Sequence, residues 1–530
     1  MRQQTVLRGA VWLMISAAAA KLLGAVFRIP LTAMLGGAGM GYFSCAYGLF
    51  LPVFALSVTG MNTAAAALTA QALARGDTAE AEGIARAARR MFGRAGFAGS
   101  VLLFLFARPL CTAVLHNPHA APAVMLFAPA VWFCCMSAVL RGLHEGCRQM
   151  IPTAISQVTE GIGRVVFGLL LAALAMRYPD RVQRFLPAGT PPEAAGAAAA
   201  IFGVTLSAAA GTLTLALFPR CIPRLPYAQR LPAVRMREVR RALLTLLLPV
   251  AAASLVTNLT TLVDLATGLR GLSAGILRTP ERFGLSADAA ATEADALANF
   301  CYGAYSGLAV TVFNLVPAVT NMLGKAVLPA FAEQSAQGCR TGMQQHAEDV
   351  MRRTAFIAVP AGLGICVLAK PILQFLFASR PLEAETAAPA LSVLGIAVIF
   401  TAMSCPLFSM MQASGHAGDT VTVMLYGAGV KLIGNLLLIP RTGLCGAALS
   451  TLLCYLTVLI GSAYLFVRRT GLHLRLFRSI AAVSVCGIAC AVTACMLYPQ
   501  LSGLPQRAAL LLSIACGGAV YLPAVRLACR

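Results

Sequence analysis

The sequence predicts an all-α polytopic membrane protein of about fourteen transmembrane helices, arranged as two six-helix lobes followed by a C-terminal helix pair. Of 530 residues, 59% are hydrophobic and only 11% are charged, whereas soluble domains carry roughly 25% charged residues. Apolar stretches long enough to cross a bilayer core about 30 Å thick recur along the whole chain. They are continuous Leu, Ala, Val and Phe runs, unlike the polar and apolar alternation of a β-barrel.

The apolar stretches fall into three groups along the chain. The first six predicted spans are 8–28, 41–70, 91–115, 122–143, 151–176 and 195–219. The next six are 242–266, 300–331, 354–378, 387–413, 420–439 and 443–467, and the last pair is 479–498 and 507–528. We therefore expect an N-lobe over residues 1–220, a basic cytoplasmic linker over 221–241, a C-lobe over 242–468 and an extra helix pair over 469–530.

The Lys and Arg residues concentrate on alternate loops, and this predicts the orientation of the chain. With the N-terminus in the cytoplasm, the cytoplasmic segments hold 25 of the 41 Lys and Arg residues, and the opposite loops hold 11. Positively charged loops are retained in the cytoplasm, so both termini are predicted there. The net charge of +22 then reflects membrane topology, and no nucleic-acid partner is expected.

The two predicted lobes share sequence features at a common offset of about 260 residues. The third and ninth spans end in Ala107-Arg108-Pro109-Leu110 and Ala369-Lys370-Pro371-Ile372, and Arg164 in the fifth span corresponds to Lys431 in the eleventh. Six spans per copy preserve the orientation of each copy. We therefore expect repeats related by an axis along the membrane normal, with a central cavity between the lobes.

Charged residues inside the predicted spans are the candidate binding residues, because a charge near the bilayer centre costs at least about 2.5–3.5 kcal/mol and usually faces a cavity. Cations outnumber acids there, which predicts an anionic guest. With the cations toward the span ends counted as loop residues, the remaining cations are Lys21, Arg28, Arg164, Lys325 and Lys431, and the acids are Glu160 and Asp264.

Lys21 and Arg28 lie about 20 and 30 Å along the first span from Arg8, at 1.5 Å per residue. They are seven residues apart and so share one helix face. Pro30 follows and is expected to bend the helix beyond Arg28. Both residues are candidates for lining a cavity, and the alternative for Arg28 is that its side chain extends to the outer interface.

Glu160 and Arg164 are four residues apart on one helix, the spacing at which side chains pair. The pair is either a structural ion pair or part of a binding site. Lys431 has Gly427 four residues earlier instead of an acid, so its charge is expected to be available to a ligand. Lys325 and Asp264 lie near span ends, where solvation at the interface is the simpler interpretation.

The sequence lacks the motifs of common soluble enzymes. It contains no Walker A sequence, no Rossmann glycine pattern and no HExxH. The seventeen cysteines lie mostly in apolar runs without paired spacing, and are predicted to be small buried hydrophobic residues. No enzymatic activity, metal or cofactor is therefore expected.

Several stretches resemble the stage V sporulation protein B group of polysaccharide-biosynthesis flippases, in the superfamily that also holds lipid II flippases, O-antigen flippases and multidrug/toxin exporters. The resemblance runs over nearly the whole chain. The stretches that carry it are Lys21-Leu22-Leu23-Gly24 through Arg28 to Gly36-Gly37-Ala38-Gly39-Met40-Gly41, Leu140-Arg141-Gly142, Gly146, Met150 to Gln157 with Glu160 and Arg164, Asn314-Leu315, Leu328-Pro329-Ala330, Lys431 with Asn435 to Pro440, and Gly446 to Thr451.

This resemblance implies a V-shaped carrier in the bacterial cytoplasmic membrane that moves an undecaprenyl-diphosphate-linked saccharide or peptidoglycan precursor outward. Its partners would be that anionic lipid, the surrounding membrane lipids and cell-wall synthesis enzymes. In lipid II flippases, arginines of the first and eighth helices face the diphosphate. Arg28 and Lys21 match the first-helix positions, whereas the eighth span has Tyr302-Gly303-Ala304-Tyr305-Ser306 and no arginine.

Two other functions remain open at this point. A cation-coupled multidrug/toxin exporter would need a carboxylate for cationic drugs or protons, but the charges in the spans are mainly positive. A non-transporting membrane scaffold for cell-wall synthesis would need no cations in its spans at all.

Overall fold

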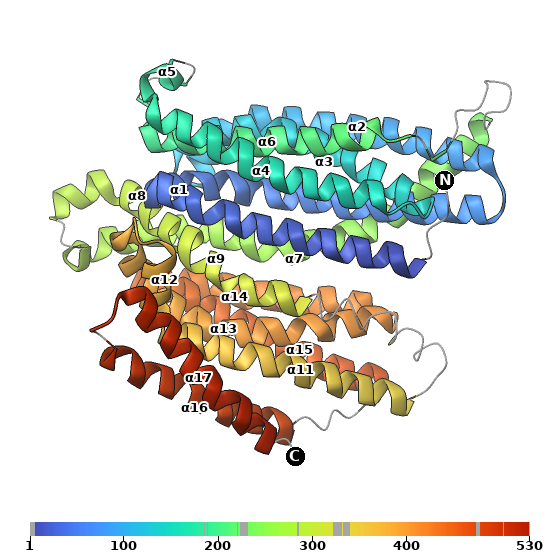
Figure 1. The fold of residues 1–530 in the computed structure, drawn as a ribbon. Coiled ribbons are helices and arrows are strands. Elements are labelled where there is room, and N and C mark those ends of the chain that lie inside the picture. Colours follow the sequence, from blue (N-terminus) through green and yellow to red (C-terminus); the bar gives the residue numbers. More distant parts are fainter. Residues whose placement is uncertain are drawn as a thin grey trace. The chain divides into compact units, whose positions relative to one another are not determined.

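The computed structural model describes residues 6–184, 186–187, 189–219, 221–222, 232–283, 286–321, 331, 340–472, 477–501 and 503–528, and the regular elements in these ranges are helices (Figure 1). This agrees with the predicted all-α class. The chain forms two compact units, unit 1 over Met1–Leu265 and unit 2 over Ala266–Arg530.

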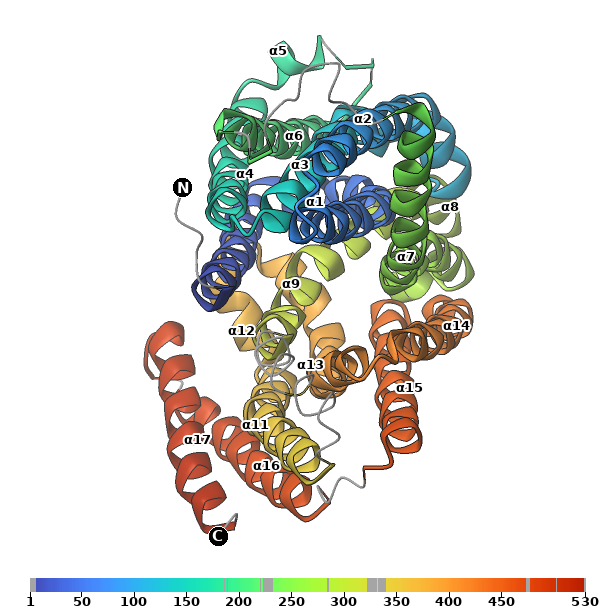
Figure 2. The same ribbon diagram turned by 90° about the vertical axis from the view of Figure 1, so that its right-hand side faces the viewer.

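Unit 1 is a helix bundle in which α3 packs against α1, α2 and α6, and α4 packs against α1 and α6. Figure 2 shows this bundle nearly end on, with α3 among its neighbours. Its elements are α1 (Val6–Ala74), α2 (Thr78–Pro109), the π-helix η1 (Leu110–Val114), η2 (Pro118–Ala120), α3 (Ala121–Gly146), α4 (Ile151–Arg177), α5 (Pro179–Gln183), α6 (Pro192–Leu217) and the first part of α7 (Ala233–Arg278).

The first two predicted spans form α1, which is broken at Gly36. This residue has φ 67° and ψ −171°, a conformation that only glycine adopts without strain. The helix continues through Pro30, so the break is at Gly36, whereas the sequence analysis placed a bend at Pro30.

Unit 2 repeats the packing pattern of unit 1. The neighbouring pairs α2–α3, α3–α6 and α4–α6 of unit 1 correspond to α11–α13, α13–α15 and α14–α15 of unit 2. Its elements are the end of α7, η4 (Pro280–Phe283), α8 (Ala287–Ala304), the π-helix η5 (Tyr305–Ala309), α9 (Val310–Phe313), α11 (Arg340–Val367), α12 (Ala369–Leu376), α13 (Pro381–Ala413), α14 (Ala417–Thr442), α15 (Leu444–Thr470), α16 (Phe477–Gln500) and α17 (Gln506–Ala528).

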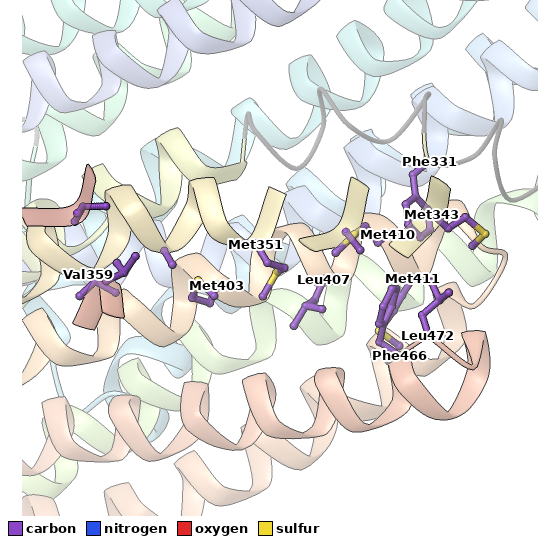
Figure 3. Close-up of a cluster of buried hydrophobic side chains, with 14 of the residues drawn as sticks. Phe331, Met343, Met351, Val359, Met403, Leu407, Met410, Met411, Phe466 and Leu472 are labelled. Atoms are coloured by element: carbon purple, nitrogen blue, oxygen red, sulfur yellow. The ribbon is translucent and has the colours of Figure 1, made fainter. Parts of the chain in front are cut away.

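A methionine-rich core joins the last two helices to the rest of unit 2. Met343, Met351, Met403 and Met410 are buried in it among aliphatic and aromatic side chains (Figure 3). Unbranched Met side chains fill the irregular gaps between helices. The hydroxyl of Tyr521 on α17 donates to the carbonyl of Phe356 on α11 at 2.9 Å, so the C-terminal pair is held to the core by a specific contact.

Twelve helices among the described residues are long and apolar enough to cross a membrane, as expected for a multi-pass membrane protein. The predicted count of fourteen is not confirmed. The stretch Leu22–Ala74, which includes the break at Gly36, counts as a single candidate although it covers most of two predicted spans. Helix α7 contains the predicted span 242–266 but is not among the twelve candidates.

Along the chain, the boundary between the two units falls within α7, beyond the basic segment predicted as a linker. Gly60 of α1 faces Leu247 of α7, and Gly48 faces Leu265, so the first part of α7 packs within unit 1. Residues 223–231 of the predicted linker 221–241 lie outside the described residues. The division into lobes, linker and extra pair therefore stays a prediction.

Candidate functional site

Glu160 on α4 is the centre of a cluster of buried charges in unit 1. Its Oε2 atom lies 2.9 Å from Nη2 of Arg141 on α3. Its Oε1 atom lies 3.1 Å from Nη2 of Arg164, one helical turn further along α4. The side chains of Arg141, Glu160 and Arg164 are 12%, 17% and 24% exposed. The predicted pairing of Glu160 with Arg164 is thus present, and Arg141 is a second partner.

Small residues allow the helices to approach closely around this cluster. The Ser156 hydroxyl accepts a hydrogen bond from Arg141 at 2.9 Å and donates to the carbonyl of Gly211 on α6 at 3.0 Å. A Cβ atom at Gly211 would lie 3.2 Å from Cβ of Glu160. Small residues at helix interfaces in membranes permit such packing, and here they fix the position of Glu160.

The cluster has more positive than negative charge. Two guanidinium groups share one carboxylate, and the Nε atoms of Arg141 and Arg164 are buried without a hydrogen-bond partner in the described part of the chain. A buried donor without an acceptor is costly. These two N–H groups could therefore bind an anionic oxygen.

Arg28 is connected to this cluster through Tyr47, and both residues belong to α1. The guanidinium of Arg28 lies 5.9 Å from the centre of the Tyr47 ring, within the range of a cation–π contact. Tyr47 also lies close to Arg164. Its ring stacks on Phe43 with centroids 5.6 Å apart. The structure thus brings Arg28, Arg164 and Glu160 into one region of unit 1.

The other predicted charges are placed as follows. Lys431 on α14 of unit 2 is 4% exposed. It has an interaction with another group, and its availability to a ligand stays a prediction. Lys21 belongs to α1, but its side chain is outside the described part, and Lys325 lies outside the described residues altogether. Asp264 on α7 is half-buried and also makes a polar interaction.

Arg141 is the site residue that sequence reasoning missed. It lies near the end of its span, so it was counted with the loop cations. Its pairing with Glu160 depends on how α3 and α4 pack, and no sequence spacing reports that contact. The available signal was its place in the stretch Leu140-Arg141-Gly142 that carries the family resemblance.

Two thiols meet beside the end of α3. Cys147 follows α3 and Cys221 follows α6, and the Cys221 thiol lies 3.6 Å from the carbonyl of Leu143. The Cys147 thiol donates to the Cys221 sulfur and, with a smaller contribution from His144, lowers the pKa of Cys221 to about 5. The same contact, together with burial, raises the pKa of Cys147 above its ordinary value. One thiolate and one thiol are therefore expected near neutral pH.

Comparisons with known proteins agree with the arrangement of the helices. Residues 6–335 match the polysaccharide biosynthesis protein family, and residues 296–512 match the lipid II flippase MurJ family. Stage V sporulation protein B of Bacillus subtilis strain 168 is 25% identical over 502 residues, covering 92% of this chain and 89% of that protein.

Two solved structures share the fold. The lipid II flippase MurJ in an inward closed conformation has a TM-score of 0.67 at 15% identity, covering 98% of both chains. An inward-facing multidrug resistance MATE family transporter has a TM-score of 0.61 at 14% identity, covering 85% of this chain and 94% of that one. These two proteins are a flippase and a transporter rather than enzymes.

Proposed function

The chain belongs to the polysaccharide biosynthesis protein family, and from this premise we propose that it is a flippase for a lipid-linked saccharide. Its substrate would be an undecaprenyl-diphosphate-linked sugar or a peptidoglycan precursor, carried across the bacterial cytoplasmic membrane. The relatives described as a sporulation protein and as lipid II flippases support a role in making the cell envelope. Membrane lipids, and enzymes of cell-wall synthesis, are the proposed partners.

The observation that carries this proposal is the excess of buried positive charge in unit 1. Arg28, Arg141 and Arg164 lie there with two carboxylates, those of Glu160 and Glu145. Glu160 pairs with Arg141 and Arg164, and Glu145 lies near Arg141 on α3. A guanidinium group binds phosphate oxygens through paired N–H donors. Such a site would neutralise a diphosphate while the prenyl chain remained in lipid.

The roles within the site follow from the contacts. Glu160 holds Arg141 and Arg164 in position, so these arginines would present their remaining N–H groups to the diphosphate. Arg28 would add a further cation from α1. Lys21 and Lys431 are proposed as additional contacts on the same chemical grounds. Transport would proceed by alternating access, in which the lobes rock about the substrate site.

A cation-coupled exporter is the second candidate, because the MATE transporter shares the fold. Such an exporter would use a carboxylate within the membrane to bind a cationic drug or a proton. Both oxygens of Glu160 are already engaged by arginines, so a cation would have to displace one of them. This contact favours the flippase over the exporter.

Reconstitution in liposomes tests the proposal. The substrate is a fluorescent undecaprenyl-diphosphate sugar, and its arrival in the opposite leaflet is followed by quenching from outside. The control lipid carries the same sugar and prenyl chain without the diphosphate. We expect the protein to accelerate movement of the diphosphate lipid alone. Equal acceleration of both lipids, or of neither, would reject recognition of the diphosphate.

A further inference from the structure

A large cavity opens at the end of unit 1 where α2 ends and α3 and α6 begin. Its volume is about 970 Å³, at the upper end of the roughly 300–1,000 Å³ of small-molecule sites. The short helix α5 projects at this end of the bundle (Figure 1), and residues of the segment after it complete the wall. We call this cavity the α2–α6 groove.

The walls of the α2–α6 groove are mainly apolar. Phe104, Met125, Leu126 and Phe202 line it. Phe104 and Phe202 are also 50% and 40% exposed on the surface of unit 1. Because these surfaces belong to candidate membrane-spanning helices, an apolar chain could enter the groove directly from the bilayer.

One cation lies on the lining, in the last turn of α2. Arg108 is exposed and lines the groove together with Thr112, His119 and Thr190. Its side chain forms no ion pair with any described residue. The stretch from Phe104 to Met125 contains no acid, and Glu193 on α6 is not among the lining residues. The groove therefore combines apolar walls with an uncompensated positive charge.

In unit 2, the cation at the position equivalent to Arg108 is paired with a carboxylate. Lys370 occupies the position of Arg108 in the repeat, within Ala369-Lys370-Pro371-Ile372. Its Nζ atom lies 2.7 Å from Oε1 of Glu385 on α13. Unit 2 thus supplies its own counter-charge, whereas unit 1 leaves the equivalent cation facing an apolar cavity.

We infer that the α2–α6 groove binds an anionic phospholipid of the surrounding bilayer, with its headgroup phosphate at Arg108 and an acyl chain along Phe104, Met125 and Phe202. The position at helix ends suits a headgroup at the membrane interface. Only four of the lining residues have polar side chains, which offers little to bind a saccharide. This inference does not depend on the proposed flippase activity.

Native mass spectrometry of the purified full-length chain tests the inference. The protein is exchanged into mixed phosphatidylglycerol and phosphatidylcholine, and the retained lipids are counted. Wild-type protein should retain phosphatidylglycerol preferentially. Arg108→Gln should lower that preference about fivefold, the effect of losing one cation near a lipid headgroup. Arg94→Gln is the matched control, because Arg94 is an exposed arginine on the same helix that does not line the groove.

A second variant tests the groove itself. Ala199 lines it and is half-buried, so Ala199→Trp should fill it and remove the retained phosphatidylglycerol while Arg108 remains. Equal lipid preference in wild type, Arg108→Gln and Arg94→Gln would overturn the inference. Displacement of phosphatidylglycerol from the wild type by an undecaprenyl-diphosphate sugar would also overturn it, since the groove would then be a substrate site.

Discussion

Glu160 places one carboxylate oxygen against each of two arginines, so its loss affects more than one contact. Glu160→Gln would leave Arg141 and Arg164 close together with little exposure and without the carboxylate that pairs with both of them. Arg164→Gln is milder, because Glu160 keeps Arg141 at 2.9 Å. The effect of a substitution therefore depends on whether it removes the shared acid or one of the two arginines.

We expect Glu160→Gln to lower the free energy of unfolding by about 3–5 kcal/mol, the usual effect of leaving a buried charge without its partner. Arg164→Gln should cost clearly less. The double variant should regain only part of the stability lost in Glu160→Gln, since Arg141 remains without its ion-pair partner. Thermal unfolding in detergent measures all three.

An exposed pair on unit 2 serves as the control for this series. Asp349 and Arg353 have the same spacing of four residues and a 2.9 Å contact, but are 52% and 71% exposed. Asp349→Asn should change stability by no more than about 0.5 kcal/mol. If Glu160→Gln were as mild as Asp349→Asn, the buried cluster would not have the energetic role assigned to it.

The thiol pair gives a prediction about pH. Because the pKa of Cys221 is lowered to about 5, its thiolate is present throughout pH 6.5–8, and its alkylation by iodoacetamide should change little over that range. An ordinary thiol with a pKa of about 8.5 would slow about twentyfold. Peptide mass spectrometry resolves Cys221 from the other cysteines.

Cys147→Ala is the control for this measurement. It removes the donor that lowers the Cys221 pKa, so alkylation of Cys221 should then fall with decreasing pH as for an ordinary thiol. A steep pH dependence of Cys221 in the unmodified protein would show that the two thiols do not interact.

At the scale of residues, spacing along one helix was enough to predict one contact of the site and not the others. The pairing of Glu160 with Arg164 follows from four residues on one helix. The contacts of Arg141 with Glu160 and of Arg28 with Tyr47 depend on tertiary packing and on a chain reversal at Gly36. For Lys431, a missing acid four residues earlier did not mean a missing partner.

At the scale of elements, glycines determine how closely the helices of unit 1 approach. Gly142 and Gly146 lie one turn apart on α3, and a Cβ atom at either would lie within 2.8 Å of a backbone carbonyl of α1. A backbone carbonyl within a helix cannot move aside without moving the helix. The glycines near Arg141 therefore set the α1–α3 packing that also positions this arginine.

We expect Gly142→Ala to destabilise the protein by about 1–3 kcal/mol, because the added methyl would lie 2.5 Å from the carbonyl oxygen of Asn62. Gly429→Ala on α14 is the control, since no heavy atom lies within 4 Å of its added Cβ. It should be neutral or stabilising by up to about 1 kcal/mol. Thermal unfolding compares them, and equal stability of the two variants would contradict the proposed close packing.

Most elements could be predicted from hydrophobic runs, and the exceptions have physical causes. The predicted spans 151–176 and 195–219 correspond closely to α4 and α6. The break in α1 could not be assigned to Gly36 rather than Pro30, because a proline is tolerated where neighbouring helices satisfy the freed backbone groups. Part of the basic segment predicted as a linker is helical, since α7 begins at Ala233.

At the scale of the whole molecule, the internal repeat is visible in both sequence and packing. The α2 and α11 helices are interrupted at matching positions, where η1 begins at Leu110 and α12 begins at Ala369. The same pairs of helices then pack together in each unit. In each unit, the helix is therefore interrupted within the same proline-containing motif. The offset of about 260 residues between the two motifs in the sequence correctly indicated the structural repeat.

The predicted topology can be tested by reporter fusions after Arg530. Because the segments predicted to be cytoplasmic hold 25 of the 41 Lys and Arg residues, a fluorescent protein that folds in the cytoplasm should be bright there. Alkaline phosphatase at the same position should be inactive. Active phosphatase with a dark fluorescent fusion would reverse the predicted orientation of the C-terminus.

The central claim is that buried cations recognise the diphosphate of a lipid-linked saccharide, and the flipping rate of charge variants in liposomes tests it most directly. We predict that Arg28→Ala and Lys431→Ala each slow flipping at least about tenfold, equivalent to about 1.4 kcal/mol, while the protein remains folded. Arg28→Lys should retain part of the rate, because a point charge replaces the bidentate guanidinium. Arg353→Ala, at an exposed arginine, should behave as wild type. Wild-type flipping rates in both Arg28→Ala and Lys431→Ala would contradict the account.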